Sequence, residues 1–211
     1  MSKNLFTEEN VIQVLDWAYD KALNGLPGNP TVYELADSYL TKHPSIEDAI
    51  NSLIKWQNTK SATSGFVTGV GGLITLPVAI PANISSVLYI QTRMIAAIAH
   101  MRGYDLKDDQ IQSFVYVALT GHSAAGIMKQ AGIKLGINLG NQLVKRVPFE
   151  VIKAINKAVG FRLMTKFGTK GIINLGKAVP ILGGAIGGTV DGVSTNVIGK
   201  TSKRLFVVSI N

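Results

Sequence analysis

The sequence predicts an all-α fold: a single helical domain over residues 1–211, packed as one compact bundle of roughly eight to ten helices. Three observations support this prediction. Apolar residues recur at the spacing of one helical face, and helix-start signals precede several of these segments. No segment shows the strict alternation of apolar and polar residues that is typical of strands.

The helix-start and helix-stop signals are clearest in the first half of the chain. Thr7 is expected to begin a first helix that Gly25 ends. A turn rich in proline and glycine follows, and Thr31 opens a capping-box sequence. Ser45 and Asp105 are predicted to cap two further helices. Residues 1–40, although helical, are the less distinctive part of the domain.

No charged residue lies between Lys60 and Arg93, which raises the question of a membrane-spanning helix. The stretch is long enough, but glycine weakens a helix and each interior proline costs about 3 kcal/mol. The helix-breaking residues are Gly65, Gly69, Gly71, Gly72, Pro77 and Pro81. We therefore predict a break near the two prolines, followed by a long helix over about 82–102 at the centre of the bundle that does not span a bilayer.

Arg93 is the first charge after this neutral run, and it shares the polar side of the long helix with Tyr89. A charge in so apolar a region needs a partner, and we predict that Asp191 provides it. The residues expected nearby are Asn83, Gln91, Tyr104 and Asp105. Two alternatives stay open: a structural ion pair, or a small polar site that binds a phosphate or carboxylate.

Small residues recur at helical spacing in two places. One stripe contains Gly184, Gly188, Asp191 and Gly199, and the other runs Gly132, Gly136, Gly140. Glycine destabilises a helix unless close packing compensates. Both stripes are expected to pack against other helices or to face a membrane.

Charge is divided unevenly along the chain. Residues 1–128 hold eight Lys and Arg against eleven Asp and Glu, a net charge of −3, whereas residues 129–211 hold thirteen against two, a net charge of +11. Within the basic half, residues 149–167 alternate an apolar side with Lys153, Lys157 and Lys166. This pattern is typical of a helix lying on an anionic membrane, and also of an ordinary amphipathic helix packed on a core.

Signals for catalysis are weak. The chain has no cysteine, and its three histidines lack the spacing of a zinc site, so we expect no metal and no cofactor. Phosphate-binding and nucleophile-elbow motifs are missing. Aromatic residues do not alternate with the basic ones as a stacking surface would require, so we expect no nucleic-acid partner.

Several motifs resemble a known bacterial family, the EcsC family. They are the glycine-rich run 65–77, IPAN at 80–83, QTRMI at 91–95, GYDL at 103–106, and the C-terminal pattern of Gly184, Gly188 and Asp191. The resemblance covers most of the chain from about residue 40 onward. It implies a helical protein associated with the bacterial membrane or envelope, in a family named for a gene beside an ABC-transporter operon. No catalytic residue comes with it.

Two functional classes remain open. The first is a lipid-interacting or accessory binding protein, peripheral on an anionic membrane face, with membrane lipids and an envelope protein such as a transporter as partners. The N-terminus lacks the apolar segment of a secretory signal, so we expect the inner face of the cytoplasmic membrane. The alternative is a hydrolase-like enzyme that uses Arg93, Tyr104, Asp105 and Asp191.

Overall fold

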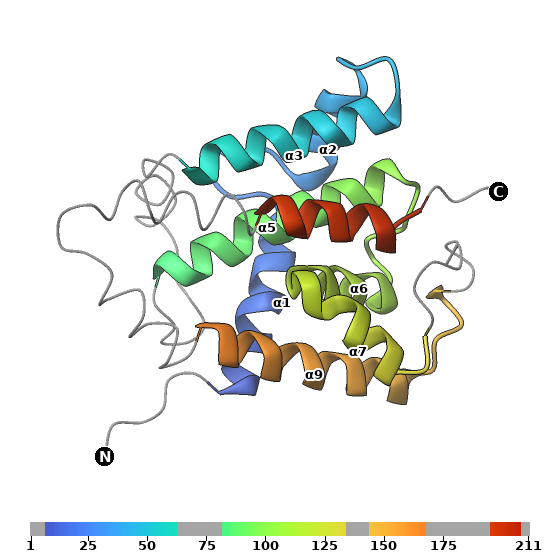
Figure 1. The fold of residues 1–211 in the computed structure, drawn as a ribbon. Helices are drawn as coiled ribbons and strands as arrows, with labels where there is room; N and C mark the ends of the chain where they lie inside the picture. Colours follow the sequence, from blue (N-terminus) through green and yellow to red (C-terminus); the bar gives the residue numbers. More distant parts are fainter. Residues whose placement is uncertain (1–6, 63–81, 134–143, 168–194, 208–211) are drawn as a thin grey trace.

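The computed structural model describes residues 7–62, 82–133, 144–167 and 195–207, and within these ranges the chain is almost entirely helical (Figure 1). Its only bridge between extended residues there joins Leu26 and Asn29. The all-α prediction is confirmed. The elements are α1 (Glu8–Asn24), α2 (Val32–Leu40), α3 (Ile46–Ala62), α5 (Ala82–Met101), α6 (Asp109–Leu119), the 3-10 helix η1 (Gly121–Ser123), α7 (Ala124–Gln130) and α9 (Phe149–Phe167). Residues 195–205 form a last helix.

Most of the predicted helix boundaries are confirmed, because local capping bonds set them. The Thr7 hydroxyl accepts a bond from the Asn10 amide at 3.1 Å, and Gly25 ends α1 with a φ of 82°. Thr31 forms the full capping box that begins α2. The Ser45 hydroxyl accepts a bond from the Asp48 amide at 3.1 Å at the start of α3.

Two predicted helical positions are wrong. Asp105 does not cap α6, because its carboxylate accepts a bond from the Lys107 amide at 3.0 Å and closes a turn. The helix begins later, after Asp108. Gly132 is not part of a helical stripe, because it adopts a φ of 77° in the turn that follows α7. The rest of that stripe and Gly184 and Gly188 lie outside the described residues.

Helix α5 lies at the centre of the bundle and packs against α1, α2, α3 and α6 (Figure 1). It begins at Ala82 as predicted, and it is buried on nearly all sides, its serines included. Residues 63–81, with the glycines and prolines of the neutral run, lie outside the described part of the chain. Among the helices that the structure describes, none has the length and apolar character needed to cross a membrane.

The helix 195–205 lies between α3, α5 and the end of α6 (Figure 1). Gly199 lies directly against Ile54 of α3, which confirms the expectation of close packing at this glycine. Phe206 packs edge-on against Tyr104 with ring centroids 5.2 Å apart. On the side of the molecule away from α3, α9 lies across α1, α6 and α7.

Candidate functional site

Arg93 projects from α5 toward α2 and the turn that precedes it. Its Nη2 donates a hydrogen bond to the Pro30 carbonyl oxygen at 2.6 Å. Burial lowers the pKa of the Arg93 guanidinium, and the nearby Tyr89 and Glu34 oppose that shift. In the described part of the chain the partner of Arg93 is thus a carbonyl, with no carboxylate in ion-pair contact. Asp191 lies outside the described residues, so the predicted pair stays a prediction.

Three polar atoms of this part of α5 are buried without a hydrogen-bond partner among the described residues: Tyr89 Oη, Thr92 Oγ1 and Arg93 Nε. Tyr89 lies against Trp17 of α1, with ring centroids 6.1 Å apart. Leaving a buried donor or acceptor unpaired costs about 1–3 kcal/mol. The three unpaired atoms around Arg93 therefore lower the stability of the fold.

Three of the other predicted members of this cluster have different neighbours. Gln91 Nε2 donates to Thr195 Oγ1 at 3.4 Å, a long bond between two buried side chains. Tyr104 packs on Phe206, and Asp105 bonds the Lys107 amide. Asn83 lies in the first turn of α5. Within the described chain, these contacts do not gather the predicted residues around Arg93.

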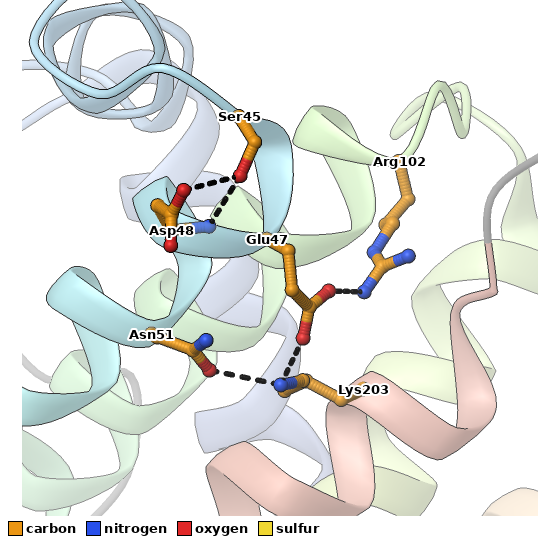
Figure 2. A network of polar contacts seen from close by, with 6 residues as sticks. All are labelled: Ser45, Glu47, Asp48, Asn51, Arg102 and Lys203. Carbon is orange, nitrogen blue, oxygen red and sulfur yellow. Dashed lines mark hydrogen bonds and ion pairs between the residues drawn. The ribbon is translucent and has the colours of Figure 1, made fainter.

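A polar network that the sequence did not reveal joins three distant segments (Figure 2). Glu47 of α3 forms ion pairs with Arg102, after α5, and with Lys203 of the last helix. Lys203 also donates to Asn51 Oδ1 at 2.8 Å. These bonds lower the pKa of the Glu47 carboxyl, the Lys203 bond most. Glu47 lies 55 positions from Arg102 and farther still from Lys203, so no local pattern could identify the ion pairs.

A second network missed in the sequence joins α1 to α6. The Tyr116 hydroxyl donates to Asp16 Oδ1 at 2.7 Å, and Gln112 Nε2 donates to the same oxygen at 3.0 Å. Burial raises the pKa of Tyr116, so this hydroxyl stays protonated. The bonds fix how α6 lies on α1. No group of three or more histidine or acidic side chains that could hold a metal occurs in the described residues.

The apolar side of α9 faces the protein interior. Ile152, Ile155, Val159 and Leu163 are all buried in the main core. Gly160 lies so close to α1 that a Cβ there would be 3.3 Å from the Glu8 carbonyl oxygen. The apolar side of residues 149–167 therefore packs on the core, which is the second of the two interpretations that the sequence pattern left open.

The opposite side of α9 is exposed and carries cations. We define the outer face of α9 as Phe149, Lys153, Lys157 and Phe161, which follow one another at four-residue steps and span an arc of about 120° around the helix. Both lysines are exposed, and the two phenylalanines are 63% and 53% exposed. Lys153 Nζ lies 4.6 Å from the Phe149 ring centroid. Lys166 lies over the Phe167 ring near the end of the helix, 5.0 Å from its centroid.

Comparison with known protein families shows which family the chain belongs to. The model of the EcsC protein family matches residues 9–208. The chain belongs to the EcsC family. No curated protein and no solved structure matches it. The EcsC match includes the N-terminal helices, which the sequence motifs alone did not reach.

The residues that carried the EcsC resemblance fall into two groups in the structure. Gln91 and Arg93 lie in the middle of α5, and residues 103–106 form the turn after it, where Gly103 has a φ of 83°. The glycine-rich run with Pro77 and Pro81, and the C-terminal glycines with Asp191, lie outside the described residues. The described EcsC motif residues belong to the central helix and its turn, and the outer face of α9 is separate from them.

Proposed function

We propose that this EcsC protein is a peripheral membrane protein that attaches to anionic lipid through the outer face of α9. The observation that carries the proposal is the exposed row of cations on a helix whose apolar side is already buried. Helix α9 holds Lys153, Lys157, Arg162 and Lys166 against one acidic residue, Glu150. A basic surface of this kind is attracted to the anionic lipids of a cytoplasmic leaflet.

Two further features support attachment at this face. The basic half of the chain, residues 129–211, carries a net charge of +11, so the long-range field there favours an anionic surface. Residues 1–128 carry a net charge of −3, so the excess positive charge comes from the C-terminal part of the chain, to which α9 belongs. Attachment through an exposed helix face is reversible, so high salt is expected to weaken its electrostatic part and carbonate to release the protein.

The experiment is cosedimentation with vesicles of phosphatidylcholine, with and without phosphatidylglycerol, at physiological salt. Each lysine near an anionic surface contributes about 1 kcal/mol, so replacing Lys153, Lys157 and Lys166 by glutamate lowers binding by at least about 100-fold. The control reverses two exposed lysines away from α9, Lys42 after α2 and Lys55 of α3. Equal binding of the α9 variant and the wild type would refute the proposal, provided that both have the same circular-dichroism spectrum.

A further inference from the structure

The two phenylalanines of the outer face are unusual for an exposed surface. Four large hydrophobic residues of the described chain are exposed: Ile46, Trp56, Phe149 and Phe161. The first two lie on α3. The other two flank the lysines of α9. Aromatic side chains on a cationic helix face are typical of proteins that enter the interfacial region of a bilayer.

The geometry of α9 suits a shallow insertion. Phe149 and Phe161 are twelve residues apart, so they lie roughly 18 Å apart along the axis, at a rise of 1.5 Å per residue. Lys153 and Lys157 lie between them, both along the axis and within the arc of about 120° that separates the two rings around it. Lysine side chains are long enough for their ammonium groups to stay among lipid headgroups while neighbouring aromatic rings go deeper.

Helix α9 has no other large apolar side chain that it could present to a membrane from its outer face. Ile152, Ile155, Val159 and Leu163 are held in the core, and the close contact of Gly160 with Glu8 prevents α9 from rotating. A purely electrostatic surface needs no phenylalanine, and leaving two rings in water is unfavourable. The lysines and the two rings together therefore favour a binding partner that is anionic at its surface and apolar just beneath it. A lipid bilayer has this structure.

We infer that Phe149 and Phe161 insert into the bilayer and act as the two anchors of α9, while the lysines between them contact the headgroups. This inference rests on the proposed membrane attachment and adds an apolar component to it. Such a component is insensitive to salt, because salt screens charges and not the burial of apolar surface. It also fixes the axis of α9 parallel to the membrane plane.

The test uses tryptophan as a depth probe. Trp17 and Trp56 are replaced by phenylalanine, and a single tryptophan is placed at position 161 or 149 (F161W, F149W). On phosphatidylglycerol vesicles, the emission of either probe is expected to shift to shorter wavelength and to be quenched by lipids brominated near the headgroup end of the chain. A protein that keeps Trp56 as its one tryptophan, on α3, is the control and should show neither effect.

A second variant measures the affinity. Replacing both phenylalanines by serine is expected to lower vesicle binding by at least about tenfold, and to remove the binding that remains at high salt. Ile46→Ser, at an exposed apolar residue of α3, should leave both unchanged.

The two proposals fail differently. A protein that cosediments with vesicles while the probe at position 161 stays in water would overturn the insertion and leave electrostatic attachment intact. A protein that cosediments with no anionic vesicle would overturn both. Loss of binding in the serine variant without any spectral change in the probes would also overturn the insertion.

Discussion

Gly199 of the last helix lies so close to Ile54 of α3 that a Cβ on the glycine would come within 2.8 Å of Ile54 Cγ1. Ile54 Cδ1 and Cγ2 would each be 2.9 Å away, so both branches of the side chain are in contact and moving one of them does not relieve it. Gly199→Ala is therefore expected to destabilise the protein by about 1–3 kcal/mol, despite the higher helix propensity of alanine.

Urea unfolding measures this effect, and two variants serve as controls. Gly126→Ala in α7 meets nothing within 4 Å, so it should stabilise the protein by about 0.5–1 kcal/mol. Ile54→Ala combined with Gly199→Ala should cost less than the sum of the two single changes. A stabilising Gly199→Ala would show that the two helices are not in this close contact.

Two tyrosine hydroxyls are expected to have opposite effects on stability. The hydroxyl of Tyr89 is buried without a partner among the described residues, so Tyr89→Phe should stabilise the protein by about 1 kcal/mol. The hydroxyl of Tyr116 donates to the Asp16 carboxylate, so Tyr116→Phe should destabilise it by about 1–3 kcal/mol. Denaturant midpoints of the two variants test this contrast directly, and equal effects of the same sign would contradict it.

The ion pairs of Glu47 predict a pH dependence. The hydrogen bond from Lys203 and the charge of Arg102 lower the pKa of Glu47 in the folded protein, so its contribution is present above the unfolded pKa and is lost as pH falls through the folded value. The carboxylate is 47% exposed, so solvent screening limits the contribution to about 1 kcal/mol. Glu47→Gln should cost this amount at pH 7, and progressively less as pH falls below the ordinary glutamate pKa of about 4.3 and through the lower folded value. A pH-independent difference in unfolding free energy would contradict the assignment.

The pairing of Arg93 with Asp191 also makes a measurable prediction. Removing one partner of a buried pair is strongly destabilising, by roughly 3–5 kcal/mol, and Arg93→Ala with Asp191→Ala should then cost less than the sum of the single changes. Thermal or urea unfolding of the four proteins of this cycle gives the coupling. Additive effects would mean that the bond to the Pro30 carbonyl is the main interaction of Arg93.

The sequence predicted best what depends on near neighbours. The caps at Thr7 and Thr31 and the start of the long helix at Ala82 follow from residues within one or two turns, and the structure confirms them. The prediction of Asp105 as a cap is wrong because its carboxylate can either cap a helix or close a turn, and in the structure it closes the turn by accepting a bond from the Lys107 amide.

What the sequence could not predict depends on tertiary packing. The pattern over residues 149–167 fits a membrane surface and a protein core equally well, and only the contacts of Ile155 and Val159 show that the apolar side is buried. The exposure of Phe149 and Phe161 follows from that orientation. The network of Glu47 with Lys203 joins opposite ends of the chain, so no spacing rule reaches it.

The most direct test of the account places a spin label on each side of the molecule. The natural chain has no cysteine, so a single cysteine takes one label without ambiguity. Ala154 is exposed on the outward side of α9, and Lys55 is exposed on α3. On phosphatidylglycerol vesicles, the label at position 154 should collide more with oxygen and less with a water-soluble nickel chelate, while the label at position 55 stays unchanged. Bound protein in which the label at position 154 keeps its aqueous behaviour, or in which only the label at position 55 responds, would contradict attachment through α9.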